Sequence, residues 1–366
     1  MRIQKVLAYP VEIPYIKPWV ISGGPTSVAA NVLVQIITDD GLVGVGEGAP
    51  VPAYGDETQG TILHAIRDNL APVLIGRDPF DSEAIAHAMD KQLHGHHFAK
   101  AAIDLALYDL RGKAAGLPVY QLLGGKFRES VPLIWGVGLN DTETRVREAV
   151  EAVQAGYDTI KMKISGNPAL DWEQVSAVRA AVGPKVRIRL DANQAYRAGD
   201  CLPVFKKLET LGLEYIEQPL PRWDLDGQAA LAAALDTPIM GDESCYSPED
   251  VLTLIRHKAV DIVNIKIMKS GLARSQKIAA IAEAAGIPCM IGSMVELGVG
   301  TAAGVHFGVA TPAVTYACEL IGPAFLVDDV LEGNPYSKVP PSHAWPVPQG
   351  VGLGVTLKPA YSGGLR

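Results

Sequence analysis

The chain has 366 residues, enough for two or three domains, and the simplest division is one large domain and one smaller domain. Its 32 basic and 40 acidic side chains give a net charge of -8, and no basic run stands out, so we do not expect it to bind nucleic acid. The first residues lead into an alternating pattern rather than an unbroken apolar core. This predicts no secretory signal and a cytoplasmic protein.

One uncharged run, from Leu297 to Cys318, is long enough to imitate a membrane span. It contains four glycines, His306 and Pro312, so we interpret it as a buried helix followed by a strand and expect no membrane partner. The four cysteines of the chain are widely spaced and form no paired motif, which predicts reduced thiols rather than disulfides or a zinc site.

Residues 1–125 show a mixed pattern that predicts a small α+β domain. A strand is expected over 28–38, with a turn at Gly41 and a hairpin partner over 42–47. Helical spacing of apolar residues follows over 58–74, 81–93 and 99–115. The triplet His94, His96 and His97 precedes the last of these helices, and we interpret it as a polar loop rather than a metal site.

From Val131 onward, short apolar strands alternate with amphipathic helices, which predicts a parallel sheet with helical crossovers. Asp141 and Ser247 are expected to cap two of these helices. Eight strands are predicted, over residues 133–137, 159–164, 186–191, 215–218, 239–243, 262–267, 289–293 and 316–321. The polar residues near the ends of strands two to six recur every 24 to 28 residues, which favours a closed barrel over 126–321. The tail, 322–366, is expected to return to the first domain.

Polar residues close five consecutive strands, and active sites of barrel enzymes lie at these strand ends. Because side chains alternate along a strand, Lys161 and Lys163 are expected to face the barrel axis, as are Asn264 and Lys266. Strands two and six lie opposite each other in an eight-stranded barrel. Lys163 and Lys266 should therefore lie on opposite sides of the axis, whereas Lys269 is expected in a loop past the strand end.

Three acids, Asp191, Glu217 and Asp242, follow strands three, four and five. Their mutual repulsion would be costly without a cation, and oxygen ligands without histidine or cysteine favour a hard ion such as Mg²⁺. The positive charges of Lys161 and of this ion would lower the pKa of Lys163 and make it a better base. The pattern predicts a metal-assisted proton-transfer site.

At these residues the sequence resembles the enolase superfamily and, within it, the muconate lactonizing enzyme subgroup. The matching motifs are Lys161-Met162-Lys163, Asp191-Ala192-Asn193, Glu217-Gln218-Pro219, Gly241-Asp242-Glu243-Ser244, Asn264-Ile265-Lys266, and Gly116-Leu117-Pro118 followed by Leu122-Leu123-Gly124-Gly125. The resemblance implies a (β/α)7β modified TIM barrel with an α+β capping domain built from both termini. It also implies Mg²⁺, with Mn²⁺ as a possible substitute, held by Asp191, Glu217 and Asp242.

The same resemblance implies roles for the lysines and their neighbours. Lys163 and Lys266 would be the acid/base residues, and Lys161 would lie near the substrate carboxylate. Asn193 and Glu243 would support the metal ligands. Substrate contacts are expected from capping loops 19–26 and 51–54 and from the ends of strands seven and eight, that is from Trp19, Tyr54, Ser293, Glu296 and Glu319.

Strand eight carries a single acid, Glu319, where dipeptide epimerases of the subgroup usually have two aspartates. The pattern Glu319-Leu320-x-Gly322-Pro323 is more similar to muconate and chloromuconate cycloisomerases. We therefore expect an isomerase similar to muconate cycloisomerase that transfers a proton at the carbon α to a substrate carboxylate, in a homo-oligomer such as a dimer or octamer. Open alternatives are a racemase or epimerase of N-acylated or N-alkylated amino acids, a syn elimination as in o-succinylbenzoate synthase, and a non-catalytic barrel that binds a ligand.

Overall fold

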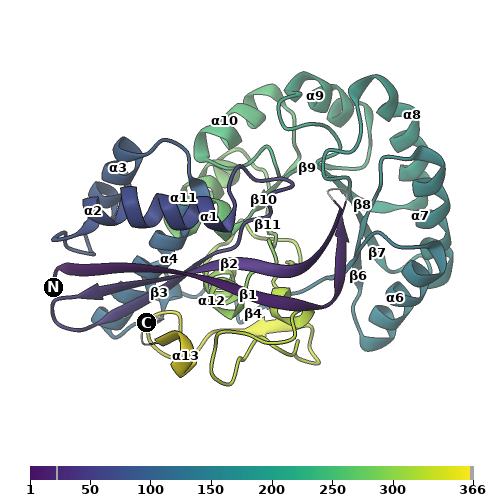
Figure 1. Ribbon diagram of the computed structural model, residues 1–366. Helices are drawn as coiled ribbons and strands as arrows, with labels where there is room; N and C mark the ends of the chain where they lie inside the picture. The colour runs from purple at the N-terminus through teal and green to yellow at the C-terminus, as the bar shows by residue number, and fades with distance from the viewer. Residues whose placement is uncertain (22–23, 363–366) are drawn as a thin grey trace.

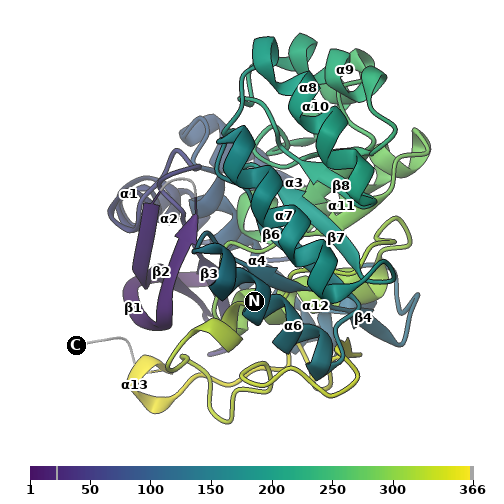
Figure 2. The same cartoon turned by 90° about the vertical axis from the view of Figure 1, so that its right-hand side faces the viewer.

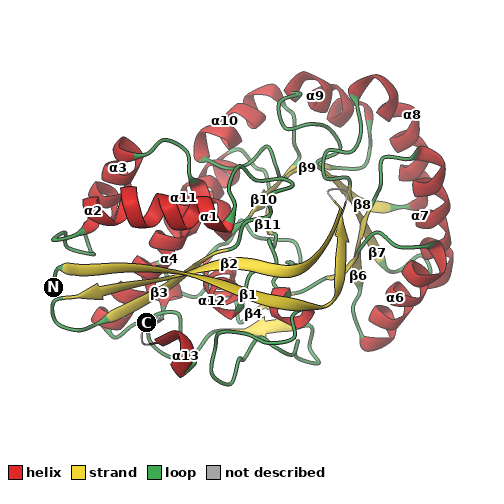
Figure 3. Ribbon diagram, in the orientation of Figure 1, coloured by secondary structure: helices red, strands yellow, loops and turns green. Residues whose placement is uncertain are grey.

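The computed structural model of the chain describes residues 1–21 and 24–362. A three-stranded antiparallel sheet with helices on one side lies beside a curved parallel sheet that is surrounded by helices (Figure 1). Seen from the side, helices α6, α7 and α8 follow one another along the outside of the parallel sheet (Figure 2). Figure 3 shows that residues 326–358 are mostly loop.

The N-terminal part begins with a long hairpin that extends from its own sheet to the mouth of the parallel sheet (Figure 1). Its strands and helices are β1 (Ile3–Ile21), β2 (Gly24–Thr38), β3 (Val43–Gly48), α1 (Gln59–His64), the π-helical η1 (Ala65–Leu70), α2 (Ala71–Leu74), α3 (Ser82–Gln92), α4 (His97–Ala115) and α5 (Val119–Leu122). The expected pairing of β2 with β3 is confirmed. Helix α4 lies so close to β3 that a Cβ on Gly44 would be 2.1 Å from the carbonyl oxygen of Ala106, which explains the small residues of this strand.

The parallel sheet has seven strands in sequential order. They are β5 (Trp135–Val137), β6 (Thr159–Lys163), β7 (Arg187–Asp191), β8 (Leu213–Glu217), β9 (Ile239–Gly241), β10 (Ile262–Ile265) and β11 (Cys289–Ile291). The connecting helices are α6 (Thr142–Ala155), α7 (Pro168–Val182), α8 (Ala198–Leu208), the short 3₁₀ helix η2 (Glu209–Leu211), α9 (Leu225–Ala234), α10 (Pro248–His257), α11 (Ile267–Ala284) and α12 (Gly298–Ala310). This arrangement confirms the predicted modified TIM barrel with its α+β cap.

The prediction of an eighth strand over residues 316–321 is wrong. Residues 316–321 form no strand, although this stretch lies between the two edges of the sheet and an isolated bridge joins Cys318 to Leu133, just before β5. The backbone N–H of Glu319 donates to Ile291 of β11, but the N–H of Ile321 already donates back to Glu319 at 2.7 Å. The chain therefore turns directly after Glu319, before a ladder of hydrogen bonds can form.

Local capping signals set the helix ends as expected. The Asp141 side chain accepts from the N–H of Thr144 at the start of α6, and Gly156 ends this helix with φ 109°. Ser247 and Asp250 form a reciprocal capping box at the start of α10. Both predicted caps are confirmed.

The tail returns to the N-terminal part. It contains the 3₁₀ helix η3 (Gly322–Phe325), β12 (Ala344–Pro346) paired with β4 (Ser130–Pro132), and α13 (Pro359–Ser362). The backbone N–H of Gly352 donates to Leu117, at the end of α4. The predicted division at residues 125 and 321 stays a prediction, because the tail contacts both parts of the molecule.

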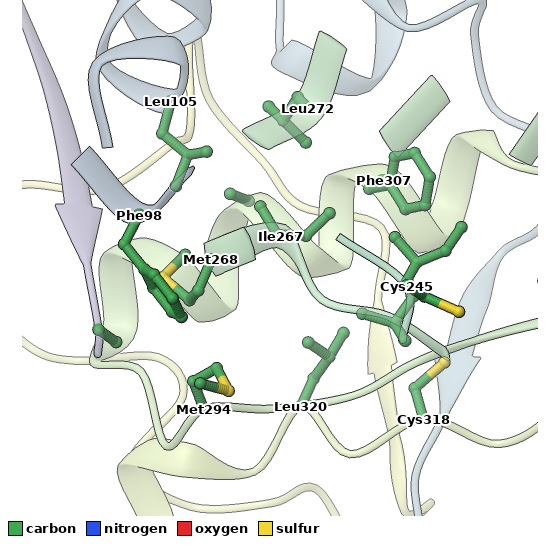
Figure 4. Packing of buried hydrophobic residues seen from close by; sticks show 14 of the residues in the cluster. Phe98, Leu105, Cys245, Ile267, Met268, Leu272, Met294, Phe307, Cys318 and Leu320 are labelled. Carbon is green, nitrogen blue, oxygen red and sulfur yellow. The ribbon is translucent and has the colours of Figure 1, made fainter. Parts of the chain in front are cut away.

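One apolar core joins the two parts. Figure 4 shows Phe98 and Leu105 of α4 in the same cluster as Met268 of α11 and Phe307 of α12. Helix α12 is buried along its whole length, as expected for the uncharged run. In the part of the chain that the structure describes, no helix is long and apolar enough to cross a membrane. All four cysteines are buried and free.

Candidate functional site

The row of predicted acids lies at the carboxyl ends of three adjacent strands. Lys163 of β6 pairs in register with Asp191 of β7, which pairs with Glu217 of β8. Asp242 follows the last residue of β9 directly. Asp191 and Glu217 are 0% exposed and Asp242 is 1% exposed, so their charges must be compensated by neighbouring side chains.

Lys161 supplies compensation at the centre of this row. Its Nζ lies 2.9 Å from Asp191 Oδ2, 2.8 Å from Glu217 Oε2 and 2.6 Å from Glu319 Oε1. Burial alone would lower the pKa of Lys161, but the three carboxylates raise it well above its ordinary value. Lys161 is therefore charged and links the row to the segment that follows α12.

The other lysines attach to the two ends of the row. Lys163 Nζ lies 2.6 Å from Asp191 Oδ2, and Lys266 Nζ lies 2.7 Å from Asp242 Oδ2. The expectation for Lys269 is wrong. This residue lies in the first turn of α11, is 2% exposed, and donates to Asp242 Oδ1 at 2.8 Å.

The position of Lys269 follows from a break in α11. Gly271 has φ 65° inside this helix, and Asp104 of α4 accepts from the N–H groups of Leu272 and Ala273 beyond the break. The turn before the break thereby aims Lys269 at Asp242. The sequence carries no periodic signal for this contact, because Lys266 precedes the helix with an extended backbone and only Lys269 lies in its first turn.

The acids differ in the direction of their pKa shifts. Burial opposes ionisation of Asp191, but Lys161 and Lys163 lower its pKa to about 2. Burial likewise opposes ionisation of Asp242, whose pKa Lys266 and Lys269 hold well below its usual range. Burial and the neighbouring Asp191 raise the pKa of Glu217 well above its usual range. Removing a negative charge from this row, or adding a cation, would lower the raised pKa of Glu217 first.

The donor set fits a hard divalent cation. In the described residues no three acid, histidine or cysteine side chains converge on one point, because lysine ammonium groups hold the three carboxylates. Lys161 Nζ already brings one positive charge within 3 Å of two of these carboxylates. Mg²⁺ binds oxygen donors such as these carboxylates, which come from three adjacent strands. The Lys161 ammonium group already places a positive charge between two of them.

Asn193 and Glu243 lie beside the acids, as predicted. The Asn193 amide donates to Glu243 Oε1 at 2.9 Å, and Asn193 Oδ1 accepts from Lys163 at 2.8 Å. Burial raises the pKa of Glu243 to about 7, with a contribution from Asp242. Asn193 therefore connects Lys163 with Glu243 on one side of the row.

A cavity of about 70 Å³ lies over Lys161 and Lys163, and Lys266 is not among the described residues that line it. Of the predicted substrate-binding residues, Trp19, Ser293 and Glu319 line it together with Lys161 and Lys163. Its remaining lining is Ile134, Gly136, Val137, Val295, Ile321 and Phe325. Gly136 and Phe325 also line the cavity, although neither charge nor motif marks them in the sequence.

The other predicted substrate contacts lie elsewhere. Glu296 is buried and accepts from Ser293 Oγ and from the N–H of Met294, so it shapes the loop after β11. The carbonyl of Tyr54 accepts from the Tyr246 hydroxyl. Neither side chain is among the described residues that line the cavity. Residues 22 and 23 of the first capping loop lie outside the described residues. In the histidine triplet, His96 Nδ1 lies 3.5 Å from Glu57 Oε1.

Comparison with known proteins agrees with this geometry. Residues 4–124 match the mandelate racemase/muconate lactonizing enzyme N-terminal domain, and residues 144–361 match the enolase C-terminal domain-like family. The chain belongs to the enolase superfamily, in the muconate lactonizing enzyme subgroup. The predicted class, a metal-dependent isomerase, is thereby confirmed.

Three relatives with different activities are similar to this isomerase. N-succinyl-L-Arg/Lys racemase of Bacillus cereus is 36% identical over 93% of this chain and 92% of its own length. Chloromuconate cycloisomerase of Cupriavidus necator is 36% identical over 98% of this chain and 97% of its own length. A solved dipeptide epimerase of Enterococcus faecalis, complexed with Mg and the dipeptide L-Leu-L-Tyr, has a TM-score of 0.91 and 36% identity over 97% of this chain and 100% of that chain.

Proposed function

We propose that the enzyme transfers a proton at the carbon α to the carboxylate of a small substrate, with Lys163 and Lys266 as the two acid/base residues. The observation that carries this proposal is the attachment of these lysines to opposite ends of the carboxylate row, on Asp191 and Asp242. An α-carbon held above the row would meet one amine on each face. One lysine removes the proton and the other returns a proton to the opposite face.

Asp191, Glu217 and Asp242 would hold Mg²⁺, or Mn²⁺ in its place. When bound, the ion supplies Lewis-acid stabilisation of the negative charge that develops on the substrate carboxylate. Lys161 binds the same substrate carboxylate on the side opposite the ion. Its ammonium group lines the cavity and is buried beside Asp191. Lys269 and Asn193 hold Asp242 and Lys163 in position.

The formal charges around Lys161 support a substrate with one negative charge. A divalent ion would favour ionisation of Glu217 and Glu243, whose pKa values are raised. Five ionised carboxylates (Asp191, Glu217, Asp242, Glu243 and Glu319) and four ammonium groups (Lys161, Lys163, Lys266 and Lys269) would leave one excess negative charge before the ion itself is counted. A divalent ion would turn this excess into one positive charge. A single substrate carboxylate would then neutralise the site.

The cavity lining favours a racemase or epimerase of N-acylated or N-alkylated amino acids. Apart from Lys161 and Lys163, the described lining residues include no cation, and the one acid among them is Glu319, whose Oε1 lies 2.6 Å from Lys161 Nζ. An amide N–H or an alkylated nitrogen can face Glu319, whereas a second carboxylate would be repelled. The named activity of the racemase relative is of this kind.

Cycloisomerisation of a muconate is the second candidate. It is favoured by the Glu319-Leu320-x-Gly322-Pro323 pattern and by the alignment of the cycloisomerase relative over 98% of this chain. Lys161 would then have to compensate Glu319 fully, as its 2.6 Å contact with this acid allows. Elimination by syn loss of water remains the third possibility.

Proton exchange in D₂O decides among these candidates. The Mg²⁺-loaded enzyme should exchange the α-proton of N-acylamino acids, as followed by NMR, and kcat/KM should exceed that for cis,cis-muconate. Glu319→Gln should lower the exchange of N-acylamino acids, while the exposed control Glu332→Gln should not. Turnover of muconate without any exchange of nitrogen-bearing acids would support cycloisomerisation instead, and a product with a new double bond would support elimination.

The assembly and the cellular location stay predictions of the sequence. Light scattering of the purified enzyme tests for the expected dimer or octamer. Replacing Mg²⁺ by Mn²⁺ in the exchange assay tests whether the second ion also supports proton transfer.

A further inference from the structure

Lys163 is the last residue of β6, and the ladder of hydrogen bonds between β6 and β5 stops before its backbone carbonyl. Strand β5 ends at Val137, one residue short of the position opposite Lys163. If the parallel register continued, the N–H of Leu139 would donate to the Lys163 carbonyl. That N–H instead donates to the carbonyl of Val20 in β1 at 3.0 Å. The carbonyl of Lys163 therefore needs another donor.

Arg145 of α6 supplies this donor. Its Nη2 donates to the carbonyl oxygen of Lys163, and its Nη1 donates to Gln174 Oε1 on α7. The amide of Gln174 is itself oriented, because its Nε2 donates to the carbonyl of Asn140 at 2.9 Å. The guanidinium group thus replaces the missing bond of the ladder and connects the end of β6 to two helices.

The burial of Arg145 has a free-energy cost that its partners do not offset. The side chain is 0% exposed, both of its partners are neutral oxygens, and Nε has no hydrogen-bond partner among the described residues. Burial lowers the pKa of Arg145 to about 10, while the negative charge of Asp171 opposes this shift, so the group is charged at neutral pH. A buried charge without a carboxylate in contact disfavours folding. Such a conflict with stability is expected where a residue serves a functional site.

The carbonyl that Arg145 holds belongs to a residue whose side chain acts in the proposed reaction. Lys163 Nζ lies 2.6 Å from Asp191 Oδ2 and 2.8 Å from Asn193 Oδ1. Both partners belong to β7 or to the residues directly after it. These two contacts therefore depend on the end of β6 staying level with the end of β7.

The turn after Lys163 is held by a different residue. Asp171 accepts from the N–H of Ser165 at 2.8 Å and from the N–H of Gly166 at 2.9 Å. Loss of the Arg145 side chain would therefore release the end of β6 and leave the following turn in place.

We propose that Arg145 is a positioning residue for proton transfer, which holds Lys163 in place through its backbone carbonyl. This inference rests on the proposed function, in which Lys163 serves one face of the α-carbon and Lys266 serves the other. Lys266 is bound at the far end of the carboxylate row, where its Nζ lies 2.7 Å from Asp242 Oδ2. Arg145 should therefore affect only one of the two exchange reactions.

Exchange of the α-proton in D₂O, measured with each enantiomer of one N-acylamino acid and the Mg²⁺-loaded enzyme, tests the proposal. Lys163→Ala first identifies the enantiomer whose exchange needs Lys163. Arg145→Met should lower kcat for that enantiomer by up to about 10², the loss expected when a reacting group is displaced by about 1 Å. KM should be unchanged, because Arg145 is not among the described residues that line the cavity. Exchange of the other enantiomer should be unchanged as well.

Two further variants show whether the effect belongs to this guanidinium. Arg147→Met removes an exposed arginine from the same helix and should change neither exchange reaction. Arg145→Lys returns the charge and one donor, so its kcat should lie between that of Arg145→Met and that of the wild type. An equal loss for both enantiomers in Arg145→Met would overturn the proposal, because a general disturbance of the fold does not select one lysine.

Gln174→Met keeps Arg145 and removes only its second contact, so it tests the proposal if Arg145→Met fails to fold. Exchange of the enantiomer that needs Lys163 should fall by up to about fivefold, the equivalent of one hydrogen bond. The absence of a selective loss in this variant would overturn the proposal. If Lys163→Ala and Lys266→Ala lost the same exchange reaction, the proposed function itself would be wrong, whatever the effect of Arg145→Met.

Discussion

Two groups of buried acids in this enzyme are compensated in opposite ways. Asp191, Glu217 and Asp242 face the ammonium groups of lysine side chains. Around the first turn of α12, Glu47 accepts from the backbone N–H groups of Leu297 and Gly300, and Asp329 accepts from that of Gly298. Lysine side chains can move and share their acids with a metal ion and a substrate, whereas backbone N–H groups cannot leave their helix. The first group is therefore suited to chemistry and the second to joining the cap to the barrel.

Removing divalent ions should have the largest effect of all the changes predicted here, and it should affect only the first group of acids. Chelation should abolish α-proton exchange, because the lysines alone cannot stabilise the charge on the substrate carboxylate. Mg²⁺ should restore the activity. The acids around α12 need no ion, so the far-ultraviolet circular dichroism should be unchanged. Exchange that persists fully in excess chelator would contradict the assignment of Asp191, Glu217 and Asp242.

Substitution of the two end lysines separates their roles. Lys163→Ala and Lys266→Ala should each lower exchange by about 10²–10⁴, the usual contribution of a positioned acid or base. With the two enantiomers of one substrate, each variant should lose a different exchange reaction. NMR in D₂O measures both. If each variant retained wild-type exchange with both enantiomers, neither lysine would be the base.

Glu47→Gln tests the second group of acids. The amide keeps the shape of the carboxylate but places N–H donors where Glu47 accepts from Leu297, Gly300 and Asn31. One unsatisfied buried donor should lower the free energy of unfolding by about 2 kcal/mol. Urea denaturation measures this loss, and the exposed control Glu332→Gln should stay within about 0.5 kcal/mol of the wild type. Unchanged stability of Glu47→Gln would remove the contrast between the two groups.

His306 of α12 extends the comparison to pH. Its Nδ1 accepts from the N–H of Tyr120, and burial lowers its pKa to about 4. The unfolded chain binds a proton to this histidine below about pH 6.5, so the stabilisation is complete above that pH and is lost as the pH falls toward 4. Between pH 7.5 and 5.5 the wild type should lose roughly 1 kcal/mol more than His306→Gln in urea denaturation. Equal losses would indicate that His306 is not held neutral, and the exposed His257→Gln should behave as the wild type does.

Much of the fold and of the catalytic row follows from local patterns. Alternation of side chains along a strand predicted that Lys161 and Lys163 share one face, and both line the cavity. Regular spacing predicted that Asp191 and Glu217 are neighbours, and they are paired in register. Their roles as metal ligands remain predictions, because strand periodicity places a carboxylate without showing what it binds.

Predictions failed where a contact outside the periodic pattern, distant or local, decides the conformation. Lys269 reaches Asp242 because Asp104, far away in the chain, accepts the N–H groups that follow the break at Gly271. Glu296 turns away from the cavity because N–H and O–H donors of its own loop are closer. The stretch 316–321 turns after Glu319 instead of continuing as a strand. None of these outcomes leaves a periodic signal in the sequence.

By itself, the sequence determined the barrel, its cap, the helix ends at Asp141 and Ser247, and which acids and lysines lie at strand ends. These features depend on interactions within a few residues or on the period of two along a strand. Only the tertiary structure decided which lysine compensates which acid, and which side chains surround the cavity over Lys161 and Lys163. The lining of the cavity depends on segments more than a hundred residues apart, such as Trp19, Gly136 and Phe325, whose contact no local pattern encodes.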